Sequence, residues 1–295
     1  MDLTARTAGV LLHLGAWDVR VRGPRATTRV LSAVLSGLAI PEHDLPQLDI
    51  VIADTGQARG LIDGEEAWTL ALPRRGWLAP LLGYTVGTAT SVLRDLLFIH
   101  AAAVEMRGRG YVLVGAPGAG KTSAAAVLVR SGGIYLSDEV ALLDPKAGTL
   151  YPFALPLAVK PWTAKATGPL PPARQVAEEA GVKYLLPSLR APGPIPLDSV
   201  ILLDPNRPAG EMTEFSRAEM LLTLSQHPSS FRYRPRLESA FSGFVLLLRN
   251  ARCLQVGSAV PADAAAVIAR AGLAQVASER KSTTRFPRAK RYRSN

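Results

Sequence analysis

The sequence contains a single cysteine, Cys253, so the chain cannot form an internal disulfide. Having so few cysteines is typical of proteins in a reducing compartment. The sequence also lacks a long apolar run, because its most apolar stretch, residues 78–104, is interrupted by Arg94, Asp95 and His100. A membrane-spanning helix needs roughly 18 or more apolar residues, so we expect no membrane span. The first twenty residues lack the layout of a signal peptide, and we expect a cytoplasmic protein.

Acidic residues are outnumbered, with 24 Asp and Glu against 34 Lys and Arg, and the net charge is +10. Much of the excess lies in residues 278–295, which hold seven basic residues and one acidic residue. We expect this segment to be a basic, disordered tail. The alternative is that the segment contacts a partner, which could be an acidic peptide, a membrane surface or nucleic acid. Among these three partners, we do not expect nucleic acid. The hydrophobic share of 48% is typical of a globular chain with a core.

The first 77 residues predict a small α+β lobe, with short alternating runs, turn residues and one helix at residues 27–38. Residues 78–100 predict a helix with a wide apolar face. Two apolar runs follow at residues 101–106 and 111–114. They are joined by an Arg-Gly-Arg-Gly turn, which predicts a hairpin.

The second half of the chain predicts a helix at residues 121–131, followed by a strand at residues 134–136. We expect that strand to continue over residues 140–143. From residue 150 onward prolines are frequent, which indicates irregular chain with short helices. The other elements expected there are a helix at 173–180, buried strands at 200–203 and 244–248, and a final helix at 262–271.

The segment from Gly115 to Thr122, Gly-Ala-Pro-Gly-Ala-Gly-Lys-Thr, matches the phosphate-loop pattern at every fixed position. Glycines allow successive N–H groups to face an anion, and the following helix directs its positive end to the same point. Lys121 supplies a charge for the outer phosphates, and the Thr122 hydroxyl is suited to magnesium. We therefore expect ATP and Mg²⁺ to bind at Gly115, Ala116, Pro117, Gly118, Ala119, Gly120, Lys121, Thr122 and Ser123.

An acidic pair, Asp138 and Glu139, follows Lys121 by seventeen residues and ends the next apolar run. If the two strands are neighbours, a carboxylate there faces the loop. It would hold magnesium or accept a proton from an attacking hydroxyl. Because adjacent strand residues point to opposite faces, we expect one member of the pair to meet the nucleotide directly. Which of the two contacts the metal is left open.

Several other polar residues have two interpretations. Composition alone favours a core or interface histidine over a catalytic one for His100. Lys160 closes an apolar stretch. We give equal weight to two interpretations of it, a surface lysine and a contact with substrate or phosphate. Arg232, Arg234 and Arg236 alternate and would share one face of an extended strand. We favour a surface coat there over a groove for an acidic peptide.

Three segments together resemble the catalytic core of HPr kinase/phosphorylase, and still more the shorter related kinases of bacterial peptide-modification gene clusters. They are Phe98-Ile99-His100-Ala101-Ala102, the loop, and Ser137-Asp138-Glu139-Val140. The family pattern has a histidine fifteen residues before the first loop glycine and an acidic pair seventeen residues after the loop lysine. Both spacings are present here. The likeness covers roughly residues 96–160, about a fifth of the chain.

The resemblance implies a serine kinase in which Asp138 is the general base, Lys121 the loop lysine, Thr122 the magnesium-binding hydroxyl and His100 the histidine near the active site. Glu139 stands where the classical enzyme has aspartate. Residues 164–168 read Ala-Lys-Ala-Thr-Gly where the classical enzyme has a glutamate-arginine-glycine run. A serine of another peptide or protein is therefore favoured over HPr. The classical family forms hexamers, and the oligomeric state of this chain is left open.

The implied fold is α/β, with a P-loop core of the HPr kinase and ATP-dependent phosphoenolpyruvate carboxykinase type and a small N-terminal α+β lobe. We expect that lobe at residues 1–77, an HPr kinase-like domain at 78–277 and the tail at 278–295. The predicted activity is ATP- and Mg-dependent phosphorylation of a hydroxyl, most plausibly serine, on a peptide or small protein. Thr122 and Glu139 are the expected metal ligands, with Lys160 as a substrate or phosphate contact. The alternatives are a P-loop ATPase, a nucleotide-regulated binding module and a small-molecule kinase.

Overall fold

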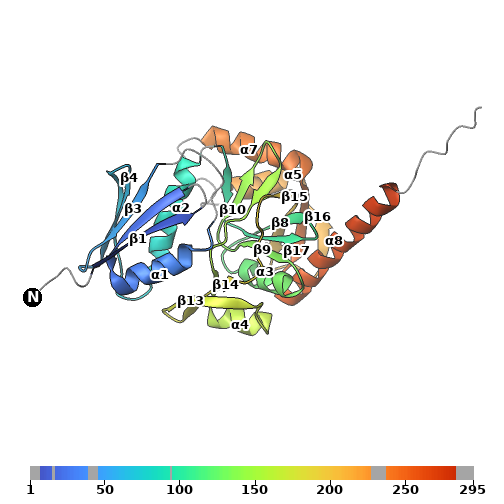
Figure 1. The fold of residues 1–295 in the computed structure, drawn as a ribbon. Coiled ribbons are helices and arrows are strands. Elements are labelled where there is room, and N and C mark those ends of the chain that lie inside the picture. Colours follow the sequence, from blue (N-terminus) through green and yellow to red (C-terminus); the bar gives the residue numbers. More distant parts are fainter. Residues whose placement is uncertain (1–6, 15–16, 39–45, 94, 227–236, 284–295) are drawn as a thin grey trace, which may run out of the picture.

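The computed structural model describes residues 7–14, 17–38, 46–93, 95–226 and 237–283. The fold is mixed α/β with three sheets (Figure 1). The arginines at 232, 234 and 236 and residues 284–295 lie outside the described residues, so the expectations for them are untested. None of the helices in the described ranges is long and apolar enough to cross a membrane.

The N-terminal lobe is a five-stranded sheet in the order β1-β2-β3-β4-β5, covered by helix α1 (Figure 1). Strands and one helix are the elements that the first 77 residues predicted. Their bounds are β1 (Thr7–Leu14), β2 (Trp17–Pro24), α1 (Arg25–Leu35), β3 (Leu48–Ile52), β4 (Gln57–Ile62) and β5 (Glu65–Ala71). Alternate residues of β2 and β3 are buried, as a sheet with one covered face requires. The lobe shares its apolar core with α2 (Leu78–Val92) and with Phe98, Leu155 and Tyr184.

The predicted helix over residues 78–100 is wrong in its last third. Helix α2 ends at Val92, and residues Leu97–Ile99 form strand β6. All three strand residues are buried, and β6 pairs antiparallel with Ala141, Leu142 and Leu143 of β10 (Ala141–Asp144). A short apolar run fits a helix or a strand equally well, so pairing with a distant strand decided the outcome.

The central sheet has the order β6-β10-β11-β15-β8-β7-β9, with β17 paired to β15 and β16 paired to β17. The predicted hairpin is confirmed: β7 (Ala102–Met106) and β8 (Arg109–Val114) are antiparallel. Its two turn residues, Arg107 and Gly108, both have positive φ, as a tight hairpin turn requires. Strand β15 (Ile195–Asp204) runs parallel to β8 and to β17 (Arg252–Gly257), so the expected strand at 200–203 is also confirmed.

Both faces of these parallel strands are covered. One face packs on α3 (Lys121–Arg130) and α8 (Pro261–Thr283), through residues such as Leu113, Ile201 and Val256. The other packs on α5 (Arg217–Gln226) and α7 (Leu237–Asn250), through Val112 and Val200. Parallel strands buried on both faces read as continuous apolar runs.

The strand expected to continue from residues 134–136 into 140–143 is broken at the acidic pair. Strand β9 (Ile134–Ser137) pairs with β7 at one edge of the central sheet, whereas β10 pairs with β6 and β11 (Thr149–Tyr151) in its other half. The Ser137 hydroxyl accepts the Val140 N–H at 3.3 Å and supports the bend between them. Residues 134–143 therefore form two strands in different halves of the sheet, and not one continuous strand.

A third, small sheet has the order β12-β14-β13, beside helix α4 (Pro161–Thr167). Its strands are β12 (Leu157–Val159), β13 (Ala173–Glu179) and β14 (Val182–Pro187). The helix predicted at 173–180 is therefore wrong. Ala180 and Gly181, both with positive φ, form a tight turn between β13 and β14, and hairpin pairing overrides the helix-favouring Ala and Glu residues.

Two C-terminal predictions also need correction. Residues 244–248 are not a strand but part of α7, where Phe244, Leu247 and Leu248 are buried at helical spacing. The predicted final helix is confirmed but longer: α8 reaches Thr283 and enters the segment expected to be a disordered tail (Figure 1). Gly272 lies within this helix. A Cβ there would lie 2.8 Å from the Tyr111 hydroxyl oxygen, so close packing explains the glycine. Strand β16 (Met212–Glu214) completes the fold.

Candidate functional site

The glycine-rich loop, residues 115–120, connects β8 to α3 as a strand–loop–helix unit. Gly115 packs so tightly that a Cβ would lie 2.8 Å from the Leu203 carbonyl oxygen. Gly120, with φ +94°, is the residue before the helix, and no side chain caps the first turn of α3. The N–H groups of that turn therefore keep their capacity to bind an anion.

Lys121 lies under this loop and is 8% exposed. Its Nζ donates to the carbonyl oxygens of Gly115, at 2.8 Å, and Ala116, at 3.3 Å. Burial lowers the pKa of Lys121, while the carboxylates of Glu139 and Asp138 act in the opposite direction. The ammonium group is thus directed toward the start of the loop rather than toward its helical end.

Asp138 follows β9 and is 2% exposed. Its Oδ2 accepts the Ala158 N–H at 3.3 Å. Burial, and secondarily the neighbouring Glu139, raise the pKa of Asp138 to about 7, against the effects of Thr122, Ala158 and Lys121. Its Oδ1 has no hydrogen-bond partner within the described ranges. The expected strand adjacency does not hold, because β7 lies between β8 and β9, but Asp138 still reaches the loop at Thr122.

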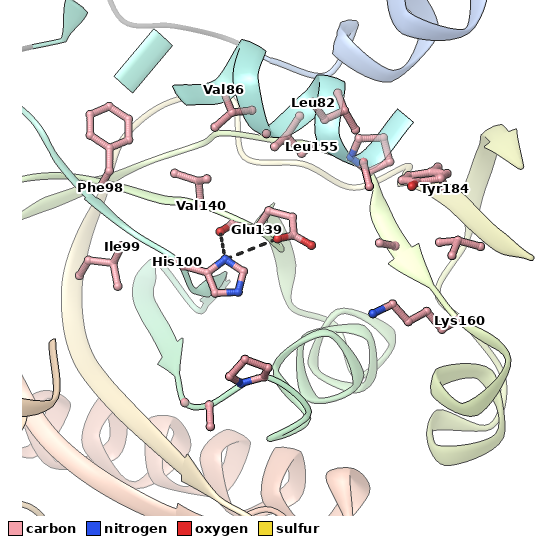
Figure 2. A pocket seen from close by; sticks show the side chains of 18 of the residues that line it. Leu82, Val86, Phe98, Ile99, His100, Glu139, Val140, Leu155, Lys160 and Tyr184 are labelled. Carbon is pink, nitrogen blue, oxygen red and sulfur yellow. Dashed lines mark hydrogen bonds and ion pairs between the residues drawn. The ribbon is translucent and has the colours of Figure 1, made fainter. Parts of the chain in front are cut away.

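Glu139 points into a cavity together with His100 (Figure 2). The His100 Nδ1 lies 3.0 Å from the Glu139 backbone oxygen and 3.4 Å from its carboxylate Oε2. Burial raises the pKa of Glu139, and the positive charges of Lys121 and Lys160 oppose that rise. Burial and the charge of Lys121 lower the pKa of His100, against the hydrogen bond to the Glu139 backbone. His100 therefore contacts the acidic pair directly.

Lys160 ends β12 and begins α4, and its Nζ lies 5.3 Å from the centre of the Trp162 ring. Figure 2 shows its ammonium group directed into the cavity from the side opposite His100. The cavity has a volume of about 890 Å³. His100, Glu139, Lys160 and the first three loop residues line it, whereas Asp138 and residues 118–123 are not part of its lining.

The residues that would hold a magnesium ion are Thr122 and the acidic pair. Magnesium is bound through one or two carboxylates plus substrate phosphates, so a larger cluster of protein ligands is not required. Among the described residues there is no group of three or more His, Cys, Asp or Glu side chains arranged for a metal. The unpartnered Asp138 Oδ1 has the capacity to accept either a cation or the proton of a hydroxyl. The Glu139 carboxylate lies beside His100.

Ser258 is a loop contact that the sequence did not indicate. It is 4% exposed, and its hydroxyl donates to the Ala119 carbonyl oxygen at 2.8 Å. It follows β17 and lies 139 residues from the loop along the chain, so no local pattern connects the two. Its own N–H bonds the Asp204 carbonyl at 3.0 Å, which ties the loop to the end of β15.

We expect Ser258→Ala to lower the free energy of unfolding by about 1–3 kcal/mol, because the buried Ala119 carbonyl loses its donor. We also expect weaker binding of MgADP, because the loop loses an anchor. Urea unfolding and titration calorimetry measure the two effects. Ser225→Ala is the matched control, since its hydroxyl donates to the Leu221 carbonyl within α5 and neither residue lines the cavity. Equal MgADP affinity in Ser258→Ala and wild type would contradict the anchoring role.

The raised pKa of Asp138 predicts a pH-dependent stability in the absence of nucleotide and metal. The neutral acid is favoured in the folded state, so the contribution of Asp138 to stability is fully present below the unfolded pKa of 3.8 and is lost as pH rises through about 7. Asp138→Asn removes this loss. From pH 5 to pH 8 its unfolding free energy should therefore gain about 1–3 kcal/mol relative to wild type. Urea unfolding at the two pH values measures it, and a pH-independent difference would contradict the shift.

No family model and no curated protein matched this chain. The protein has a mixed α/β fold. A strand of its central sheet leads into a glycine-rich loop, and a buried lysine and an acidic pair lie beside that loop.

Proposed function

We propose that this protein is an ATP- and Mg-dependent kinase that phosphorylates a hydroxyl on a peptide or small protein, with serine as the favoured acceptor. In this proposal the core around the loop is of the HPr kinase and phosphoenolpyruvate carboxykinase type. The observation that carries the proposal is the position of Lys121, whose Nζ donates to the Gly115 and Ala116 carbonyls at the start of the loop while the charges of Glu139 and Asp138 act on it. The supporting observation is the uncapped first turn of α3.

The loop and the start of α3 would bind the phosphates of ATP through their backbone N–H groups. Lys121 would exchange its bonds to the Gly115 and Ala116 carbonyls for the outer phosphates. Thr122 and Glu139 would hold magnesium, which neutralises charge on the transferred phosphoryl group. Glu139 suits this role because its half-exposed carboxylate opens into the cavity beside the loop.

Asp138 would act as the general base. Its unpartnered Oδ1 would take the proton of the acceptor hydroxyl, whose oxygen forms a bond to the γ-phosphorus while the bond from that phosphorus to the bridging oxygen of ADP breaks. A pKa of about 7 suits a base that operates near neutral pH. Its neighbours Glu139 and Ala158 line the cavity, so the cavity wall passes directly beside this carboxylate.

The test is transfer of phosphate from γ-labelled ATP to a library of serine peptides, with threonine and alanine peptides of otherwise identical sequence as references. We expect label on serine peptides, none on alanine peptides, and none without magnesium. Release of inorganic phosphate at an unchanged rate with and without every peptide would favour an ATPase and contradict the proposal.

A further inference from the structure

We propose that the cavity beside the loop binds an apolar side chain of the acceptor peptide, adjacent to the residue whose hydroxyl is phosphorylated. This rests on the proposed kinase function and names the class of peptide that the site accepts. Three observations carry the inference: the end of the loop that the cavity meets, the chemistry of its walls, and unfilled space at one wall residue.

The cavity lies at the start of the loop. Its lining includes Gly115, Ala116 and Pro117 but none of residues 118–123, whose N–H groups open the helix. Lys121 reaches toward the same end, with Nζ bonded to the Gly115 and Ala116 carbonyls. In phosphate loops this lysine contacts the β- and γ-phosphates, so the cavity adjoins the phosphate that is transferred. We therefore assign the cavity to the group that attacks this phosphate and not to the nucleobase.

The walls away from the loop are apolar. Figure 2 shows α2 above the cavity, with side chains that face toward it. The apolar wall comes from α2, β6, the chain around β10 and β12, and β14, through Leu82, Val86, Phe98, Val140, Leu155 and Val182. Burying such a surface against an apolar side chain is favourable, whereas a charged side chain there would lose hydration.

The titratable groups His100, Glu139 and Lys160 lie where the cavity meets the loop. His100 and Glu139 lie together on one side, and Lys160 directs its ammonium group toward them from the other (Figure 2). A hydroxyl held among these groups lies beside the acidic pair, which leaves the apolar wall for a neighbouring side chain of the same peptide. A few convergent polar groups within a largely apolar lining are typical of a ligand site that fixes orientation.

The cavity has room for more than the hydroxyl-bearing residue. Its volume of about 890 Å³ is near the upper end of the range for ligand sites, about 300–1,000 Å³. Gly83 of α2 is part of the lining, and a Cβ added there would meet no atom within 4 Å. We expect a leucine at this helical position to extend into the cavity space, and it would favour the helix over glycine.

The experiment measures binding of three peptides, acetyl-Leu-Ser-Leu-amide, acetyl-Glu-Ser-Glu-amide and acetyl-Lys-Ser-Lys-amide, to the full chain with MgADP, by saturation-transfer NMR. Phosphate transfer from MgATP to each peptide is measured separately. Gly83→Leu is the test variant. Tyr84→Leu is the matched control. Tyr84 is the next residue of the same helix, its side chain is 42% exposed, and it does not line the cavity. We expect the leucine peptide to bind best, and Gly83→Leu to weaken its binding about tenfold or more.

The outcomes separate this inference from the kinase proposal. Selective binding of the leucine peptide, lost in Gly83→Leu and kept in Tyr84→Leu, supports the cavity assignment even if no phosphate is transferred; in that case the kinase proposal fails alone. Equal binding of the three peptides, preference for a charged one, or no binding overturns the assignment. It is also overturned if Gly83→Leu weakens MgADP affinity and leaves peptide binding unchanged, because the cavity would then hold the nucleobase.

Discussion

Asp138→Asn is expected to lower phosphoryl transfer by about 10²–10⁴-fold, the range that a positioned general base contributes. The amide is close in size to the carboxylate and can keep contacts with Thr122 and the Ala158 N–H, but it cannot accept the hydroxyl proton. Affinity for MgADP should stay within a few-fold of wild type, because the loop amides and Lys121 are unchanged. Transfer is measured by peptide mass spectrometry, and affinity by titration calorimetry.

Glu139→Gln is the control that separates the two acids. We expect it to raise the magnesium concentration needed for half-maximal transfer while leaving substantial transfer at saturating magnesium. If Glu139→Gln abolishes transfer at every magnesium concentration and Asp138→Asn only shifts the magnesium dependence, the two roles are exchanged. Full activity of Asp138→Asn would contradict any base role for that residue.

Lys121→Ala is expected to weaken MgADP binding by about 10–100-fold, because each hydrogen bond from a charged donor contributes about 1.5–3 kcal/mol. The buried position of Lys121 makes this effect larger than that of an exposed lysine, since the ammonium acts in a site shielded from water. Titration calorimetry measures the affinity, and circular dichroism confirms that the variant is folded.

Lys165→Ala is the matched control, since Lys165 lies in the last turn of α4 and is exposed. We expect its MgADP affinity to equal that of wild type. Unchanged affinity in Lys121→Ala would count against the loop as the phosphate site.

Local signals predicted the parts of the fold that depend on neighbouring residues. The Arg107-Gly108 turn and the loop ending at Gly120 both need glycine at positive φ, and both appear where the sequence predicted them. The helix after the loop and the strand at residues 200–203 were also predicted, because an alanine-rich run and a run covered on both faces have clear patterns.

The parts that were wrong have local patterns that fit more than one structure. Residues 140–143 look like a continuation of β9, yet they pair with β6 and β11 in the other half of the sheet. Residues 173–180 have a helix-favouring composition but lie in a hairpin with β14. Phe244, Leu247 and Leu248 form one face of α7, which a short apolar run cannot distinguish from a strand.

The candidate site shows the same division. The loop residues, Asp138, Glu139 and His100 were proposed from spacing, and they lie together in the structure. The bond from Ser258 to the Ala119 carbonyl was not foreseen, because the two residues are 139 positions apart. Likewise, the apolar cavity combines α2, β6 and β14, and only the assembled fold brings those elements together.

The most direct test of kinase activity is intact-mass spectrometry of the peptide or small protein encoded beside this chain's gene, incubated with the protein, magnesium and ATP. The account predicts a gain of one phosphate on the acceptor, absent with Asp138→Asn, and fragmentation should locate it on a hydroxyl residue with an apolar neighbour. An unmodified acceptor, with ATP converted to ADP and free phosphate at the same rate in its absence, would contradict the account.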